Sequence, residues 1–149
     1  MNKYKKSIIL FAAFFFVSLQ AFSQNSPVDK FFNQYANDDR FTFVSVSPQM
    51  MQQFLNEGAN AFMATNIKSM RILTTDATPQ QFYQEAVSAL DAPPYEETMN
   101  VRKEDKAVMF LARKENGKIV ETVMIISKED KFTLIDMTGD NLDLNNLGN

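Results

Sequence analysis

Residues 107–138, AVMFLARKENGKIVETVMIISKEDKFTLIDMT, decide the fold predicted for this chain. They contain runs at about 107–113, 118–127 and 131–138 that are rich in β-branched and aromatic residues, which is typical of strands. Asn116-Gly117 separates the first two runs and is the strongest short hairpin signal, because both residues tolerate a positive φ. Glu129-Asp130 separates the last two runs. The stretch therefore predicts two consecutive antiparallel hairpins.

The sequence before this stretch adds further strands. Residues 96–102 also alternate and end at the turn Glu104-Asp105, so we predict a four-stranded meander over residues 96–138. Two earlier runs, FTFVSV at 41–46 and IKSMRILTT at 67–75, are strand-like as well.

Three helices are predicted from one recurring start signal. Ser26-Pro27, Ser47-Pro48 and Thr78-Pro79 each place a hydroxyl at the N-cap and a proline at the first helical position. Thr78 and Gln81 also complete a capping box. Apolar residues at helical spacing follow each start: Val28, Phe31, Phe32 and Tyr35; then Met51, Phe54, Leu55 and Phe62; then Phe82, Ala86 and Leu90.

Together these elements predict an α+β fold. We expect residues 24–149 to form one domain with a mainly antiparallel sheet, the C-terminal four-stranded meander, and about three helices packed on one face. Residues 139–149 form a polar, asparagine-rich tail. The chain has no cysteine, so its stability must come from the core and not from disulfides.

The two hairpin turns also predict which residues share a face of the sheet. If each turn is a two-residue loop, Phe110 pairs with Val123 and Ile125 pairs with Leu134. The first face, expected to lie under the helices, then holds Val108, Phe110, Ala112, Val123, Ile125, Phe132 and Leu134. The second face holds Met109, Leu111, Thr122, Met124, Ile126, Thr133, Ile135 and Met137. A one-residue change in either turn would exchange these assignments.

The second face is more apolar than a solvated face of an antiparallel sheet should be. Large exposed apolar patches usually mark contact surfaces. We therefore take the second face as a hypothetical binding surface, made by Met109, Leu111, Met124, Ile126, Ile135 and Met137. The alternative is that a helix of the same chain covers it, such as the N-terminal helix with Phe31 and Phe32.

Glu121 and Asp136 form the sharpest candidate for chemistry. In the same register they lie on adjacent strands, diagonal to each other, at one end of the first face. Two nearby carboxylates raise the pKa of one of them and can hold a proton or a hard cation. The alternative, which we favour, is a structural pair at the rim of the sheet with Lys114 or Arg102 as its partner.

No metal site and no cofactor are predicted. The chain has no histidine and no cysteine, which excludes the usual zinc sites and Ser-His-Asp or Cys-His catalysis. The acidic stretch 136–143 lacks the ligand order of a calcium-binding loop, so a solvated turn is expected. The nine methionines are spread along the chain, which favours core filling over copper binding.

Residues 1–23 are predicted to be a secretory signal peptide. Lys3, Lys5 and Lys6 precede the apolar run 8–17, and Ala21-Phe22-Ser23 supplies the small residues of a cleavage site. The run is shorter than the 20 or so apolar residues that span a membrane. We therefore predict cleavage after Ser23, and a mature chain in the periplasm or outside the cell with no direct membrane anchor.

The charge of the chain argues against polyanionic partners. The formal charge is −3, and cleavage of the signal removes three lysines and no acid. An acidic domain repels phosphate backbones, so we predict no nucleic-acid binding.

Several segments resemble a known family. FTFVSVSPQMM, SMRILTT, GKIVETVMIIS and FTLIDMTGDNLDL are similar to domain of unknown function 4252, a family of small exported Bacteroidota proteins. The resemblance implies an α+β cell-envelope protein, and some members occur beside sigma-factor systems. Many members carry a lipid-attachment cysteine after the signal, which this chain lacks. The resemblance brings no established activity.

The sequence leaves three functions open. The preferred one is an exported, non-enzymatic interaction module that binds an unknown protein partner or itself. The second is a carrier of a small apolar ligand between sheet and helices, which an enclosed cavity would favour. The third is an enzyme that uses Glu121 and Asp136, which convergence of the two carboxylates in a cleft would favour.

Overall fold

The computed structural model describes residues 26–56 and 66–142, and a six-stranded sheet dominates this part of the chain. The predicted signal peptide, Phe62 and the tail from residue 143 onward lie outside the described residues. The predicted α+β class is confirmed within the described residues.

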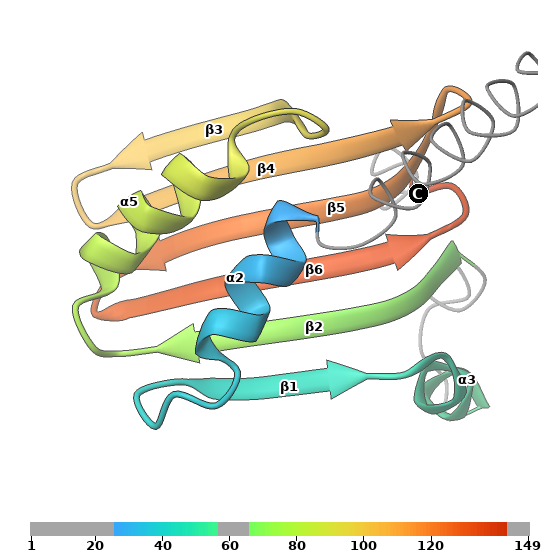
Figure 1. The fold of residues 1–149 in the computed structure, drawn as a ribbon, viewed down its shortest axis with the longest axis horizontal. Helices are drawn as coiled ribbons and strands as arrows, with labels where there is room; N and C mark the ends of the chain where they lie inside the picture. The colour runs from blue at the N-terminus through green and yellow to red at the C-terminus, as the bar shows by residue number, and fades with distance from the viewer. Residues whose placement is uncertain (1–25, 57–65, 143–149) are drawn as a thin grey trace, which may run out of the picture.

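The sheet is built around the predicted meander. Its four strands are β3 (Glu96–Lys103), β4 (Lys106–Glu115), β5 (Lys118–Lys128) and β6 (Lys131–Gly139). Two strands from the first half, β1 (Thr42–Val46) and β2 (Ile67–Thr75), extend it. The order is β1-β2-β6-β5-β4-β3, and all neighbouring strands are antiparallel. Figure 1 shows how β2 joins the meander alongside its last strand.

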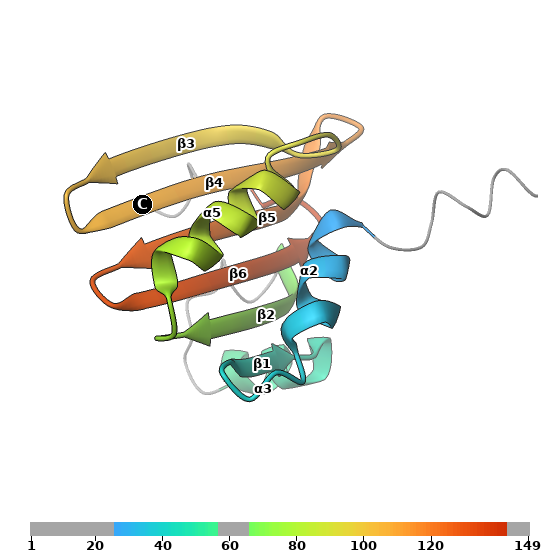
Figure 2. The same ribbon diagram turned by 60° about the vertical axis from the view of Figure 1, so that its left-hand side comes forward.

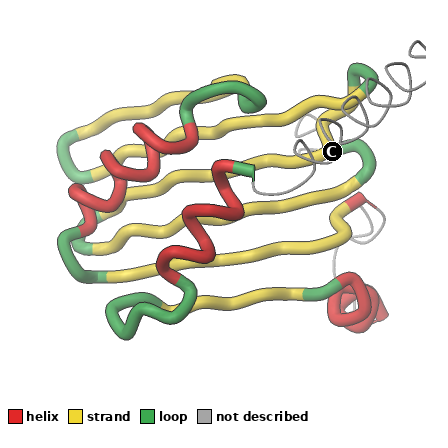
Figure 3. The backbone as a smooth tube through the Cα atoms, in the orientation of Figure 1, coloured by secondary structure: helices red, strands yellow, loops and turns green. Residues whose placement is uncertain are grey.

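The hairpin turns have the backbone that their residues predict. Asn116 and Gly117 have φ of 52° and 77°, as a type I′ turn requires. Glu129 also has a positive φ, 55°, in the turn between β5 and β6. The β3–β4 and β5–β6 turns lie at the same end of the sheet (Figure 3).

Three helices occur at the predicted starts. They are α2 (Pro27–Tyr35), α3 (Pro48–Asn56) and α5 (Pro79–Leu90). Ser26 caps α2 by accepting from the Asp29 N–H at 3.1 Å, and Ser47 accepts from the Met50 N–H at 3.3 Å. The capping box predicted at Thr78 is wrong, because Thr78 has a left-handed backbone (φ 35°) and makes no side-chain cap bond.

The helices do not all lie on the same face of the sheet. α2 and α5 lie side by side on one face, and α3 lies next to β1 at the edge (Figure 2). Met51 of α3 joins a small cluster with Val46, Ile67 and Leu142, against which Met70 and Met137 pack. The cross-strand partners Val46, Met70 and Met137 belong to the face that α2 and α5 leave free. The expectation of helices on one face therefore holds for α2 and α5 and is wrong for α3.

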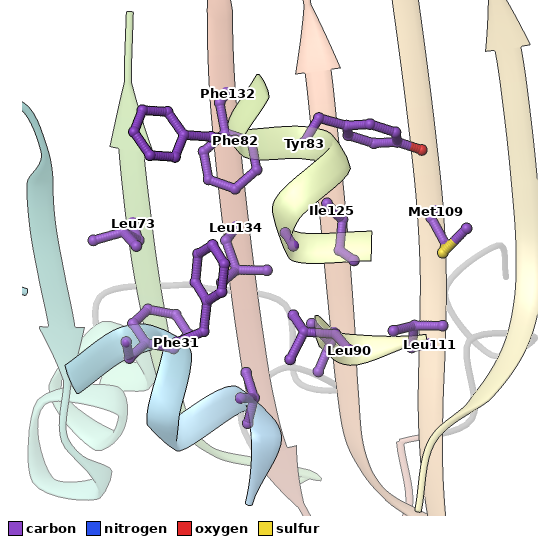
Figure 4. Packing of buried hydrophobic residues seen from close by; sticks show 14 of the residues in the cluster. Phe31, Leu73, Phe82, Tyr83, Leu90, Met109, Leu111, Ile125, Phe132 and Leu134 are labelled. Atoms are coloured by element: carbon purple, nitrogen blue, oxygen red, sulfur yellow. The ribbon is translucent and has the colours of Figure 1, made fainter. Parts of the chain in front are cut away.

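The main core lies between the sheet and the pair α2 and α5 (Figure 4). The ring of Phe132 of β6 lies there with its centroid 6.4 Å from that of Phe31 of α2 and 6.2 Å from that of Phe82 of α5. Leu73, Leu134 and other sheet residues beneath them are fully buried. Because Phe31 and Phe32 lie in this core, the alternative that the N-terminal helix covers the second face is wrong.

One bulge changes the predicted assignment of faces in β4. The β4–β5 hairpin begins in the predicted register, with Lys114 opposite Ile119, but Arg113 then faces Glu121 and Val120 is skipped. A bulge of this kind shifts every later pair by one residue. Phe110 consequently pairs with Met124 and not with Val123. The β5–β6 register is confirmed, with Ile125 opposite Leu134.

The bulge moves Met109 and Leu111 into the core. Their exposed fractions are 2% and 0%, and both belong to the cluster under α2 and α5. Their placement on the second face is therefore wrong, as is the placement of Val108, Phe110 and Ala112 on the first face.

A membrane-spanning helix is not found in the part of the chain that the structure describes, where every helix is too short or too polar.

Candidate functional site

Glu121 and Asp136 lie together on the core face, as predicted. Glu121 is on β5 and Asp136 on β6, and their exposed fractions are 4% and 2%. Arg71 of β2 is the direct cross-strand neighbour of Asp136, and Arg113 of β4 is that of Glu121. Four adjacent strands thus place Arg71, Asp136, Glu121 and Arg113 side by side, and we call these residues the charged row.

Each carboxylate in the charged row has its own arginine. Arg71 donates to Oδ2 of Asp136 from Nε at 3.1 Å and from Nη2 at 2.6 Å. Arg113 donates from Nε to Oε2 of Glu121 at 2.8 Å. The partners expected from the sequence are not the ones found, since Lys114 instead faces Glu96 at 3.7 Å.

Further contacts hold the row in place. Arg71 also donates to Oδ1 of Asp29 at 2.7 Å, and its guanidinium lies 4.5 Å from the ring centroid of Phe32. Tyr95 donates to Oε1 of Glu121 at 3.3 Å. Helix α2 thus contributes both an anion and an aromatic face to the row.

Burial and the neighbouring acid raise the pKa of Asp136. Desolvation is the largest cause, followed by hydrogen bonding and repulsion from Glu121, while Arg71 opposes the shift, and the pKa is about 7. Within the described residues, no donor reaches the buried Oδ1 of Asp136. A proton held between Asp136 and Glu121 would satisfy this oxygen and remove the repulsion. Asp136 therefore holds its proton more tightly than an exposed aspartic acid does.

A cleft of about 760 Å³ opens beside the charged row. Its lining includes Ser26 and Pro27 at the start of α2, the Pro93-Pro94 segment, and Arg71, Arg113 and Glu121 of the row. The row contains two arginines and two carboxyl groups. No group of acidic side chains suited to a metal ion occurs in the residues that the structure describes.

The opposite face of the sheet carries the other predicted site residues. Met124, Ile126 and Ile135 lie there half-buried, and Met137 lies on the same face within the α3 cluster. Sequence reasoning missed two further residues of this face. Phe110 reaches it only because of the bulge in the β4–β5 hairpin, and Ile72 could be placed there only once β2 was known to pair with β6.

Two cross-strand lines of residues run over this face from β1 to β3. The first line is Val44, Ile72, Ile135, Met124, Phe110 and Met99, and the second is Thr42, Thr74, Thr133, Ile126, Val108 and Val101. We call these twelve residues the bare face. It contains no charged side chain, and Val44 and Met99 at its two edges are 43% and 49% exposed.

Fold and site thus define a two-layer α+β domain, with a charged row beneath its helices and an apolar sheet face turned away from α2 and α5. The chain belongs to the family described as Domain of unknown function (DUF4252), whose sequence profile matches residues 35–149. This confirms the resemblance seen in the sequence. No curated protein and no solved structure matches the chain.

Proposed function

We propose that this domain is an exported, non-enzymatic interaction module that binds, through the bare face, a partner presenting an apolar surface. One observation carries the proposal: the first line of the bare face crosses all six strands and every residue in it is apolar. Of the described helices, α2 and α5 lie on the other face. Helix α3 packs against β1 and β2 at one end of the sheet. Large contiguous apolar patches are rare on the surface of proteins that act alone.

The core argues against a carrier of apolar ligands. Phe31, Phe82 and Phe132 fill the space between helices and sheet, and the side chains beneath them have no exposed surface. A ligand would have to displace close-packed side chains, which costs more than entry into a preformed cavity.

The charged row supports a structural role over catalysis. Both oxygens of Glu121 already accept hydrogen bonds, from Arg113 and from Tyr95. Asp136 is 2% exposed and is absent from the lining of the cleft, so substrate has no direct access to it. The row fixes the start of α2 on the sheet through Asp29.

Export is part of this proposal and rests on residues 1–23. Cleavage after Ser23 would leave Gln24 two residues before Ser26, which caps α2. The intact mass of the exported protein should correspond to a chain that begins at Gln24. A mature chain that retains residues 1–23 would contradict export by cleavage.

The double variant Met124→Lys/Ile135→Glu tests the binding role. The two residues are cross-strand neighbours on the bare face, so opposite charges at these positions can pair and the sheet should remain folded. The matched control is Gln84→Lys/Ser88→Glu, which places the same charges on the exposed side of α5.

The readouts are fluorescence of the uncharged dye Nile red and sedimentation equilibrium. We expect the unmodified chain and the control to enhance dye fluorescence, and the double variant to lose most of the enhancement while keeping its circular dichroism spectrum. Sedimentation shows whether a second copy is the partner. Equal dye binding by all three proteins, or unfolding of the milder variant Met124→Gln, would overturn the proposal.

A further inference from the structure

Two turns with the same four-residue sequence border the bare face. Residues 103–106 and 128–131 both read KEDK, and they form the β3–β4 and β5–β6 turns. Figure 3 shows both turns at the same end of the sheet, and the Glu129 N–H donates to the Asp105 carbonyl at 2.9 Å. The sequence repeat thus becomes a pair of neighbouring turns in space.

The turns align four lysines. Lys103 is opposite Lys106, Lys106 is opposite Lys128, and Lys128 is opposite Lys131. Each lies two residues along its strand from a member of the bare face, so all four share that face. We call them the lysine row, and all four are exposed.

The lysine row is unfavourable for the domain on its own. Like charges directly opposite each other in a sheet destabilise it. None of the four lysines forms an ion pair with another of the residues that the structure describes. Four acids occupy the tips of the two turns and lie farther from the bare face than the lysines do: Glu104, Asp105, Glu129 and Asp130. A positive border therefore separates the apolar residues from the acidic tips.

A hollow of about 460 Å³ lies where the bare face meets the lysine row. Ile126 and Thr133 line it from the bare face, and Lys128 and Lys131 line it from the row. Asp76 and the turn acids Glu129 and Asp130 complete the lining. The hollow therefore places two lysines and three acids beside the apolar Ile126, so a charged group of a ligand bound over Ile126 would lie next to these residues.

The chain itself shows which kind of element packs on this face. At the end away from the lysine row, helix α3 packs through Met51 onto the face that carries Val46, Met70 and Met137. A helix is also the usual second layer on an apolar sheet face. The remainder of the face offers the same kind of surface to a helix from another molecule.

A second copy of this chain is a poor match for the lysine row. If two copies met face to face and end to end, the row of one would lie against α3 of the other. The sequence of α3, PQMMQQFLN, contains no acidic residue. An anionic lipid surface is also disfavoured, because the chain as a whole is acidic.

We infer that the bare face binds an amphipathic helix of a partner protein, with its apolar stripe over the bare face and a flank of Asp and Glu over the lysine row. This inference rests on the proposed function and specifies its partner. Apolar contact supplies affinity, and the charges set orientation and exclude helices with a basic flank.

Two synthetic peptides of about 18 residues, or five helical turns, serve as probes. They share one leucine stripe and differ in carrying Glu or Lys along one flank. Fluorescence anisotropy should show that the chain binds the Glu peptide about tenfold more tightly than the Lys peptide at low salt, with a smaller ratio at high salt.

The variant Lys106→Gln/Lys128→Gln should bring the ratio of the two affinities close to one. The control Lys30→Gln/Lys118→Gln removes the same charge from exposed sites outside the row and should leave the ratio unchanged. The double variant Met124→Lys/Ile135→Glu should weaken both peptides.

The outcomes separate this inference from the proposed function. Equal affinity for both peptides, lost in the Met124→Lys/Ile135→Glu variant, would overturn the acidic-helix inference and leave the interaction module standing. Binding of neither peptide, with lysine-dependent binding to vesicles containing phosphatidylglycerol, would assign the face to lipid and overturn the inference. If the chain binds neither peptide and no vesicle, the acidic-helix inference is overturned as well.

Discussion

The two faces of this sheet use the same six strands but differ in what covers them. On one face α2 and α5 bury residues such as Leu111 and Leu134 completely. On the other face Phe110, Met124 and Ile135 are only half-buried. Strands with apolar residues on both sides are typical of sheets that are covered twice. The described residues supply one layer and part of a second, and we propose that a partner covers the remaining apolar area.

Neighbouring residues on β4 provide the strongest test of this difference. Leu111 is fully buried, whereas Phe110 lies on the bare face. Leu111→Ala should lower the free energy of unfolding by about 2–5 kcal/mol, and Phe110→Ala should lower it by less than half as much, although phenylalanine is larger. Urea denaturation measures both. A larger loss at Phe110 would show that the bare face is core.

These two residues also show the limit of sequence reasoning. The turn at Asn116-Gly117 is readable because its positive φ values require those residue types. The bulge at Val120 has no such signature, because a branched apolar residue is equally at home in a regular ladder. One unseen bulge was enough to reverse the faces of β4, whereas the faces of β5 and β6 were predicted correctly.

The charged row was predictable only in part. Glu121 and Asp136 could be brought together because a regular hairpin connects their strands. Arg71 could not be assigned to them, since its place depends on β2 pairing with β6 across 60 residues or so of chain. Arg113 faces Glu121 only because of the bulge. The lysine row likewise depended on the bulge, which brings Lys106 opposite Lys128.

Substitution of Arg71 should have the next largest effect on the free energy of unfolding. Arg71→Gln leaves Asp136 buried without its cation, so we expect a loss of about 3 kcal/mol in the free energy of unfolding at pH 8. Arg40→Gln, which removes an exposed pair with Asp38, is the matched control and should change stability little. Equal losses at both positions would argue against a buried charge network. Urea titrations at fixed salt measure both.

The pH dependence of stability should carry the signature of Asp136. Its pKa is raised in the folded protein from 3.8 to about 7, so the folded state binds the proton more tightly than the unfolded chain. Its contribution to stability is full below about pH 4 and falls as the pH rises toward 7. The difference in unfolding free energy between the unmodified chain and Asp136→Asn should follow this fall. A contribution that grows with pH over the same range would contradict a raised pKa.

Removing charges from the lysine row should have the smallest effect on the free energy of unfolding, and this effect should be a gain and not a loss. Lys106→Gln/Lys128→Gln removes cross-strand repulsion and should raise the free energy of unfolding by a few tenths of a kcal/mol at low salt. The gain should shrink at high salt, because salt screens exposed charges. Lower stability in this variant would mean that the lysines are paired within the domain. Thermal and urea unfolding at two salt concentrations measure the difference.

Methionine oxidation tests the central claim most directly, because methionines lie on both faces. Met109 is 2% exposed in the core, Met99 is 49% exposed at the edge of the bare face, and Met124 lies half-buried at its centre. Trypsin would place the three in separate peptides, so mass spectrometry after mild peroxide treatment can report each rate. We predict rapid oxidation of Met99, slower but clear oxidation of Met124, and protection of Met109 until the protein unfolds. Protection of Met124 equal to that of Met109 would contradict the account.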